Sequence, residues 1–274
     1  MVPDAPSATP FEPLDPIDHE VLAQFLEISG SGIQVEVLDH CASTNAYLLE
    51  RARAGAPHAG AIACEHQTAG KGRRGSAWVS APGASLTFSL LWRFGSRVAA
   101  LSGLSLAVAV ASARALESQG GAQIMLKWPN DLLFDGRKLG GILIETLHDA
   151  GSTVAVIGIG LNVRNSPSLR DRLGHQVGHL REAGALGTRT ELLAAQLAQL
   201  EQVLSSYEKE GFAPLREAWL ARHAWQGRQV QLSSGGRLHA QGETVGVAED
   251  GALLMRTAGV VKRYYSGELS LRQA

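Results

Sequence analysis

The chain has 274 residues, of which 45% are apolar and 19% are charged, a composition typical of soluble globular proteins. This length predicts one large domain and one small one. The formal net charge of −1 excludes a global attraction to nucleic acid or to an anionic membrane. The longest apolar stretch, residues 101–116, includes Arg114 and several serines, so it is too polar to span a bilayer. No signal peptide opens the sequence, which predicts a cytoplasmic protein.

Residues 1–17 hold five of the ten prolines and are predicted to form a flexible tail. A short helix is expected to begin at Asp18 and to stop at Gly30. Residues 1–30 contain six acidic residues and no lysine or arginine. Because cations that neutralise phosphates supply most of the affinity of DNA-binding modules, this segment is not expected to be one.

The next segments are predicted to be a strand at residues 33–38 and a helix from Ser43 to about Arg53. Ser43 and Thr44 can cap this helix, or contact a ligand at its N-terminus, and the two roles are compatible. Cys41, Cys64 and the histidines beside them fit no usual zinc spacing, so no metal is expected there. Residues 101–119 are predicted to be a buried scaffold helix.

A glycine-rich segment, GKGRRG at residues 70–75, matches the pattern of dinucleotide-binding loops. The context does not fit, because residues 85–92 alternate like a strand where a helix is required. Nor is it a P-loop, since no Ser or Thr follows Lys71. Lys71, Arg73 and Arg74 on a flexible backbone favour a loop that binds phosphate. The alternative is a solvated basic turn between two strands.

A second motif, KWPND at residues 127–131, lies in a predicted hairpin whose strands are residues 124–134 and 138–145. Lys127 and Lys138 stand where buried strands should be apolar. Gly140 and Gly141 remove side chains from the second strand, which usually marks the close approach of a ligand or of another backbone. The alternative is a poorly formed edge hairpin with solvated lysines.

Together, GKGRRG and KWPND followed by KLGGIL (residues 138–143) resemble the signature of bacterial biotin protein ligases. The segments VIGIGLN (156–162) and GELSLR (267–272) match that family in kind and order, so the resemblance covers residues 18–274. Lys71 replaces an arginine that is commoner in the family, which keeps the charge and loses the fork geometry. The resemblance is to the monofunctional members, which carry no N-terminal DNA-binding domain.

The family implies an α+β fold, with a mixed sheet backed by helices like that of class II aminoacyl-tRNA synthetases. The implied boundaries are a catalytic domain at residues 18–224 and an SH3-like barrel at residues 225–274. The sequence independently permits both parts, because Thr188 and Glu191 form a capping box before a long apolar helix and short strands follow Trp225. Residues 166–177 resemble a mobile loop on the adenine side.

The resemblance implies a biotin–[acetyl-CoA-carboxylase] ligase that joins biotin and ATP to biotinyl-5′-AMP and then transfers biotin to a lysine of a biotin carboxyl carrier domain. Mg²⁺ is expected to assist on ATP, with unknown protein ligands. The implied catalytic residues are Arg73, Lys138 and Asp131, of which Asp131 either deprotonates the carrier lysine or positions a metal. Residues implied for biotin are Ser43, Thr44, Asn45, Gln67, Lys71, Gly72, Arg73, Lys138 and Gly140. Residues implied for ATP and the adenylate are Gly70, Arg73, Arg74, Trp78, Asn130, Asn162, Glu268 and Arg272.

Two alternatives are open on the sequence. A lipoate ligase shares the fold and the adenylation step, although Ser43 to Asn45, the glycine loop, KWPND and the C-terminal barrel favour biotin. A non-catalytic biotin-responsive binding protein is a different class, and the acidic N-terminus does not favour it. The expected partners are biotin, ATP and the carrier domain, without nucleic acid or membrane, and a homodimer is plausible.

Overall fold

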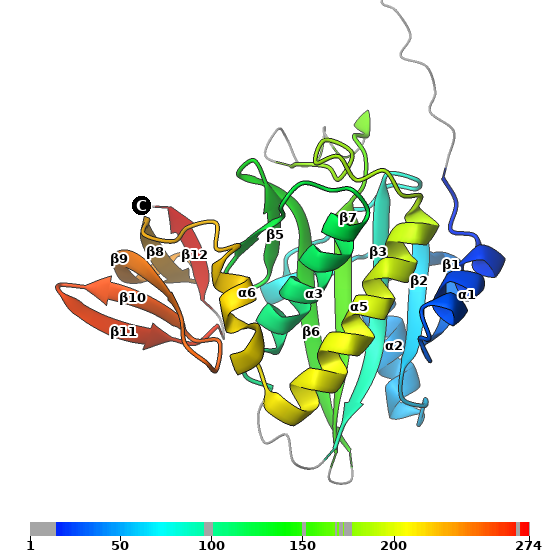
Figure 1. Cartoon of the computed structure of the whole chain (residues 1–274), viewed down its shortest axis with the longest axis horizontal. Helices are drawn as coiled ribbons and strands as arrows, with labels where there is room; N and C mark the ends of the chain where they lie inside the picture. Colours follow the sequence, from blue (N-terminus) through cyan, green and yellow to red (C-terminus); the bar gives the residue numbers. More distant parts are fainter. Residues whose placement is uncertain are drawn as a thin grey trace, which may run out of the picture.

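A seven-stranded mixed sheet forms the centre of the computed structural model, which describes residues 15–95, 101–149, 152–167, 169, 172, 177–266 and 269–273 (Figure 1). Its spatial order is β1-β2-β3-β7-β6-β5-β4. Only β1 and β2 pair in parallel, and every other neighbouring pair is antiparallel. The bounds are β1 Gln34–Cys41, β2 Gly60–Gln67, β3 Ser85–Phe94, β4 Met125–Lys127, β5 Asp131–Phe134, β6 Arg137–Asp149 and β7 Ser152–Asn162.

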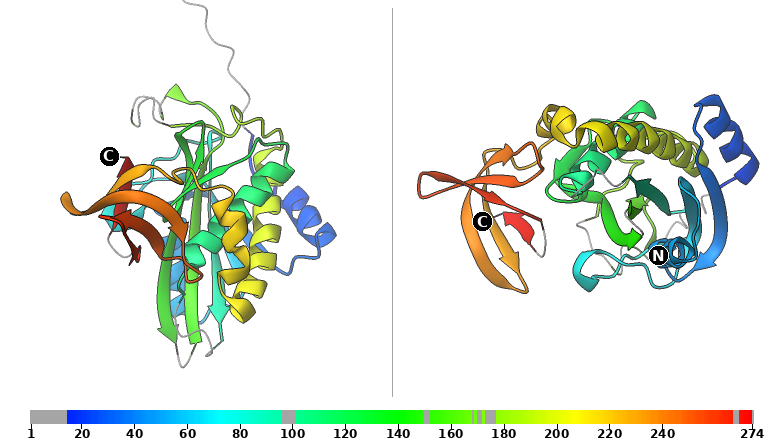
Figure 2. Two further views of the ribbon diagram at one scale, coloured as in Figure 1. Left: turned by 60° about the vertical axis from the view of Figure 1, so that its left-hand side comes forward. Right: turned by 90° about the horizontal axis from the view of Figure 1, so that it is seen from below.

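Helices cover both faces of this sheet, as the view from below shows (Figure 2). The helices α3 (Leu104–Ser118) and α5 (Arg189–Glu210) pack on each other over one face, and α2 (Thr44–Arg53) lies on the opposite face. The helix α1 (His19–Ile28) packs against α5 beside β1. Strand β7 is buried on both faces, as a central strand between two helix layers must be.

The predicted starts of α1, α2 and α5 are confirmed. Asp18 caps α1 by accepting from the backbone N–H of Val21 over 3.0 Å, and Ser43 is the N-cap of α2. Thr188 and Glu191 form the expected capping box at the start of α5, and Gly211 ends that helix. Because each cap satisfies N–H groups that a helix leaves without a partner, these short sequence signals fix where the helices begin.

Two predictions about local structure were wrong. Residues 124–134 do not form one strand, because Pro129 interrupts the run and the chain turns back, so that β4 and β5 pair with each other. The peptide bond between Trp128 and Pro129 in this turn is cis. The predicted tail also ends early: Ile17 is 7% exposed and donates its N–H to Glu65 Oε1 over 2.7 Å. Residues 1–14 lie outside the described part of the chain.

A second, five-stranded antiparallel sheet follows the short helix α6 (Arg216–Leu220) and lies beyond the β4–β5 edge of the first sheet (Figure 1). The predicted C-terminal strands are thereby confirmed. The spatial order is β11-β10-β9-β8-β12, with bounds β8 Gln229–Ser234, β9 Arg237–Val247, β10 Leu253–Thr257, β11 Val260–Tyr264 and β12 Ser270–Gln273. None of the described helices is long and apolar enough to cross a membrane.

The turn before β10 of the C-terminal sheet makes a close backbone contact with the start of α3. Gly103, before α3, and Gly251, before β10, both have positive φ angles, and a Cβ on Gly251 would lie 2.6 Å from the Cα of Gly103. The indole N–H of Trp128, in the turn after β4, donates to the Gly251 carbonyl over 3.1 Å. The C-terminal sheet is therefore docked directly against the segment that carries KWPND.

Candidate active site

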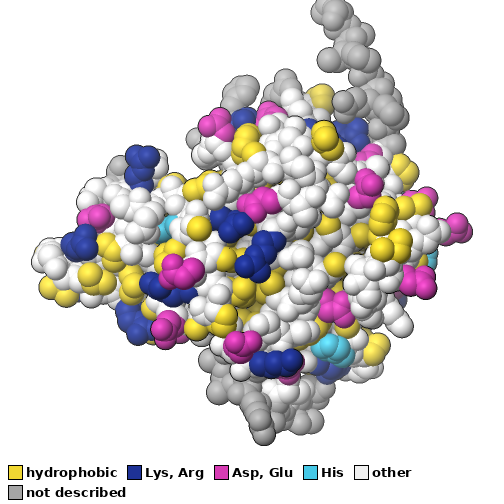
Figure 3. All heavy atoms as spheres, in the orientation of Figure 1, with side chains coloured by type: hydrophobic (Ala, Val, Ile, Leu, Met, Phe, Trp, Pro, Cys, Tyr) yellow, Lys and Arg dark blue, Asp and Glu magenta, His cyan; other side chains and the backbone are white. Residues whose placement is uncertain are grey.

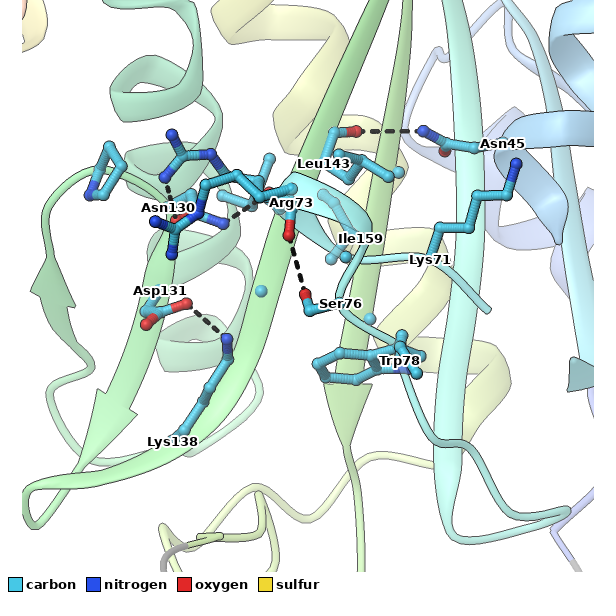
Figure 4. Close-up of a pocket in the computed structure, with 18 of the residues that line it drawn as sticks. Asn45, Lys71, Arg73, Ser76, Trp78, Asn130, Asp131, Lys138, Leu143 and Ile159 are labelled. Carbon is cyan, nitrogen blue, oxygen red and sulfur yellow. Dashed lines mark hydrogen bonds and ion pairs between the residues drawn. The ribbon is translucent and has the colours of Figure 1, made fainter. Parts of the chain in front are cut away.

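A pocket of about 280 Å³ opens on the face of the large sheet that α2 covers (Figure 4). Its volume lies near the lower end of the range for small-ligand sites. The glycine loop, the turn after β4, the strands β6 and β7, and the last strand β12 all contribute to its lining. The pocket therefore brings together all the motifs that the sequence singled out, from positions 43 to 272.

The floor of the pocket is made by glycines of β7. Along the face of β7 that points to α2, the residues run Val154, Val156, Gly158, Gly160. The two valines pack in the small apolar core under α2, and the two glycines leave the next part of the face open. A Cβ on Gly158 would overlap Asn45 Oδ1, and a Cβ on Gly160 would overlap the Trp78 indole. Any larger residue here would therefore displace side chains of the site.

The glycine loop is held by its own hydrogen bonds. The N–H of Gly72 donates to the Ser76 carbonyl over 2.7 Å, and the hydroxyl of Ser76 donates to the Arg73 carbonyl over 2.9 Å. Arg74 has a positive φ of 56°, which is uncommon for a residue with a side chain. The loop also excludes a Cβ at Gly70, which would lie 2.5 Å from the Trp78 carbonyl oxygen.

Arg73 connects three parts of the chain. Its guanidinium donates to Asn130 Oδ1 over 3.3 Å, in the KWPND segment (Figure 4), and to the Ser266 carbonyl over 3.1 Å, four residues before β12. Burial lowers the pKa of Arg73 from its ordinary value, the neighbouring Arg74 lowers it further, and Asp131 opposes this shift. An anion in the pocket would supply the charge that these surroundings lack.

The charge of the lining is strongly unbalanced. Asp131 is the one carboxylate among the lining residues that the structure describes, and it accepts from Lys138 Nζ over 2.5 Å and from Lys127 Nζ over 3.3 Å. Elsewhere on the molecule, acidic and basic side chains are interspersed over the face that Figure 3 shows. The cations of the lining are Lys71, Arg73, Arg74, Lys127, Lys138 and Arg272.

The end of the pocket under α2 is polar and buried. Ser43, Thr44 and Asn45 are each less than 5% exposed. The amide oxygen of Gln67 accepts from the backbone N–H of Thr44 over 2.7 Å. Figure 4 shows Asn45 on one side of the pocket and Lys138 with Asp131 on the other. The pocket therefore offers neutral hydrogen-bonding groups on the Asn45 side, where Lys71 also lies, and the Lys138–Asp131 pair on the other side.

Most of the residues implied by the resemblance line this pocket. Those that do are Ser43, Thr44, Asn45, Gln67, Lys71, Gly72, Arg73, Arg74, Trp78, Asn130, Asp131, Lys138 and Arg272. Gly140 does not, because its Cβ would point into the core, 2.7 Å from Leu161 Cδ2, and Gly141 lines the pocket instead. Gly70 and Asn162 lie beside the lining, and Asn162 donates to the Lys138 carbonyl over 3.2 Å. Glu268 and most of residues 166–177 lie outside the described residues.

The sequence analysis singled out Lys127 and the segment 156–162 without assigning a role in the site to Lys127 or to the glycines of the floor. Gly158 and Gly160 alternate in a run of β-branched and aliphatic residues, and this spacing was the signal that could have identified them. Lys127 contacts Asp131 and also lies 4.8 Å from the ring centroid of Trp225. No group of three or more His, Cys, Asp or Glu side chains gathers anywhere in the described part of the chain.

Comparisons with known proteins agree with this geometry. The model of the Biotin/lipoate A/B protein ligase family matches residues 37–162. The chain is 36% identical to the bifunctional ligase/repressor BirA of Salmonella typhimurium over 96% of this chain and 81% of that protein. It is 34% identical to the biotin–[acetyl-CoA-carboxylase] ligase of Paracoccus denitrificans over 78% of this chain and 90% of that protein.

Among solved structures, the biotin protein ligase of Aquifex aeolicus in complex with biotin and ATP is similar, with a TM-score of 0.75 and 28% identity. The match covers 88% of this chain and 99% of that one. Fold, pocket and relatives agree, and the chain belongs to the biotin/lipoate protein ligase family. Within that family it stands with the biotin protein ligases, and the expected α+β fold with a second C-terminal sheet is confirmed.

Proposed function

We propose that the chain is an ATP-dependent biotin protein ligase whose two half-reactions both occur in this pocket. In the first, the biotin carboxylate attacks the α-phosphorus of ATP, and pyrophosphate leaves. In the second, a lysine amine of a carrier domain attacks the biotinyl carbonyl, forms an amide and releases AMP. The observation that carries the proposal is the composition of the described lining, which combines six cations and one carboxylate with buried neutral groups under α2.

The first half-reaction joins two anions, so the site must supply positive charge before the bond can form. Arg73 is placed for this because it is partly buried and reaches from the glycine loop to the KWPND segment. Lys138 approaches from β6 on the other side of the same space. We assign Arg73 to the phosphates and Lys138 to the biotin carboxylate and the adenylate phosphate. No protein nucleophile is needed, because the substrate carboxylate is itself the nucleophile.

The neutral end is assigned to the ureido ring of biotin. This ring carries one carbonyl and two N–H groups, which need polar partners once water is removed. Ser43, Thr44 and Gln67 offer hydroxyl and amide groups there, and the backbone of Lys71 and Gly72 lies close by.

The adenine is assigned to Trp78 and Asn130, with Arg74 and Arg272 near the phosphates. The indole Nε1 of Trp78 is buried without a partner among the described residues, which supports its contact with a polar ligand. Arg272 belongs to β12 of the C-terminal sheet, so that sheet would close over the nucleotide. Asn162, whose Oδ1 is also buried without a described partner, would accept a hydrogen bond beside this position.

Asp131 is assigned to the second half-reaction. The carrier lysine must lose a proton before its amine can attack, and Asp131 is the one carboxylate of the described lining that can accept it. We do not assign Asp131 to a metal held by the protein, because it already contacts two lysines and no other carboxylate adjoins it among the described lining residues. Mg²⁺ would then enter as a part of the substrate, bound to the phosphates of ATP.

A carrier domain, a homodimer and a cytoplasmic location stay predictions. The direct test of the proposal is to incubate the protein with biotin, MgATP and a biotin carboxyl carrier domain, and to measure the mass of the carrier. The expected result is a gain of one biotinyl group on one lysine, with release of AMP. A carrier that gains lipoyl from lipoate and nothing from biotin would identify a lipoate ligase. No gain from either acid would contradict the proposal.

A further inference from the structure

Asn45 lies above a row of three residues on neighbouring strands. Ser89 on β3 and Leu143 on β6 each pair with Gly158 on β7, which stands between them. Because Gly158 has no side chain, the amide of Asn45 occupies the space above it. From there it donates to the Leu143 carbonyl over 3.3 Å (Figure 4) and accepts from the Ser89 hydroxyl over 2.6 Å.

Glu145, two residues further along β6, fixes which way round this amide lies. Its carboxylate accepts from Asn45 Nδ2 over 2.9 Å. A carboxylate and a carbonyl can only accept, so the nitrogen of the amide must face Glu145 and Leu143. The oxygen must then face Ser89, which is fully buried and has a hydroxyl proton to donate.

The same hydroxyl continues the network to Thr44 and Gln67. Ser89 Oγ lies 2.8 Å from Thr44 Oγ1, and the backbone N–H of Thr44 donates to Gln67 Oε1 over 2.7 Å. A backbone N–H can only donate, so Gln67 must present its oxygen to Thr44. Its Nε2 then points away from Thr44, toward Gly70, where a Cβ would lie 3.0 Å from it.

We propose that Ser89 and Glu145 are positioning residues for biotin recognition. Neither lines the pocket, yet together they fix the amide of Asn45, which does, before any ligand arrives. A ligand with a ureido ring meets groups whose donor and acceptor sides are already set, and so loses little free energy in ordering them. A ligand whose ring lacks N–H and carbonyl groups, such as lipoate, gains nothing from this arrangement. This inference rests on the proposed function, because it assigns this end of the pocket to the ureido ring.

The test is direct binding of biotin, and separately of MgATP, by calorimetry. For Ser89→Ala we expect biotin to bind about tenfold more weakly, as loss of one buried hydrogen bond predicts, with MgATP binding unchanged. Desthiobiotin, which keeps the ureido ring and lacks the sulfur, should lose affinity by the same factor. Ser112→Ala is the matched control, since Ser112 is equally buried, lies on α3 and has no described partner for its hydroxyl. It should bind biotin like the wild type.

Two variants of Glu145, whose side chain is partly exposed, provide a second comparison of biotin affinities. Glu145→Gln keeps an oxygen that accepts from Asn45 and should bind biotin nearly as the wild type does. Glu145→Met removes the acceptor and should weaken binding about tenfold. If Ser89→Ala does not fold, this comparison decides alone. Equal affinities of the two Glu145 variants for biotin would overturn the inference. So would a folded Ser89→Ala that binds biotin normally, or one whose affinity for MgATP falls by the same factor as its affinity for biotin. A wild type that binds no biotin would overturn the proposed function instead.

Discussion

Lys138 Nζ donates to Asp131 Oδ1 over 2.5 Å, so the cation assigned to the ligand carboxylate already has a carboxylate partner in the protein. The ligand must therefore compete with Asp131 for this lysine. Asp131→Asn removes the competing charge and keeps the shape. We expect adenylation to persist within about tenfold, and transfer to the carrier lysine to fall by about 100-fold or more, as expected when a general base is lost.

Separate assays of the two half-reactions check this prediction: pyrophosphate exchange for adenylation, and single-turnover transfer from preformed adenylate for the second step. Asp135→Asn is the matched control, because Asp135 is exposed in the turn before β6 and does not line the pocket. An equal loss in both half-reactions would contradict a role confined to transfer.

The glycine floor predicts a steric effect. A methyl group at position 158 would overlap Asn45 Oδ1, so Gly158→Ala should raise KM for biotin at least about tenfold and cost about 1–3 kcal/mol of unfolding free energy, as overpacking does. Gly60→Ala is the control, since its Cβ would meet no atom closer than 3.9 Å. Steady-state kinetics and urea unfolding measure the two effects. A Gly158→Ala enzyme with normal KM would show that Asn45 can move without consequence.

Substitution of Arg189 is expected to lower the free energy of unfolding. Its side chain is 1% exposed, and its guanidinium donates to Glu65 over 2.5 Å, to the Asp15 carbonyl and to the Ser85 carbonyl. Arg189→Met leaves Glu65 partly buried without its cation, which should cost roughly 3–5 kcal/mol of unfolding free energy.

Urea unfolding measures this cost. For comparison, Arg256→Met breaks an exposed pair with Glu243 and should change the unfolding free energy by less than about 1 kcal/mol. Similar small changes in both variants would mean that the ends of α5 and β2 hold together without the buried pair.

We expect His223 to make the free energy of unfolding depend on pH. Burial lowers the pKa of this histidine from 6.5, although a hydrogen bond with Gln226 opposes the shift. Below about pH 6.5 the unfolded chain binds a proton that the folded chain does not. The stabilisation is therefore complete above that pH and is lost as the pH falls toward the lowered pKa. His223→Gln should show a smaller decrease of unfolding free energy between pH 7.5 and 5.5 than the wild type; identical decreases would assign this pH dependence to other groups.

Local signals predicted the helix boundaries and the two charged loops, because caps and turns are encoded by residues a few positions apart. Thr188 with Glu191, and Ser43 at the start of α2, are of this kind. The segment from 124 to 134 was harder, because its apolar residues fit one strand or two equally well. Pro129 was the signal that it contains a turn.

The network beneath Asn45 could not be predicted from the sequence. Ser89 is 44 positions from Asn45, and Glu145 is 100 positions away. Their contact depends on the order β3-β7-β6, which places β7 between two strands that precede it in the chain. A buried serine and a glutamate in strands have no local pattern that marks them as partners of a ligand site. Gly140 and Gly141 likewise differ only in which face of β6 each one opens. The register between β6 and β7 decides which of the two faces the pocket.

The central claim is that Arg73 and the basic pocket activate biotin with ATP. Pyrophosphate exchange into ATP tests it most directly, with biotin or lipoate as the acid, on the wild type, on Arg73→Ala and on Arg53→Ala, an exposed arginine of α2 outside the pocket. The account predicts exchange with biotin and not with lipoate, a loss of about 100-fold or more in Arg73→Ala, and normal exchange in Arg53→Ala. Exchange that needs no biotin, or that survives Arg73→Ala undiminished, would contradict it.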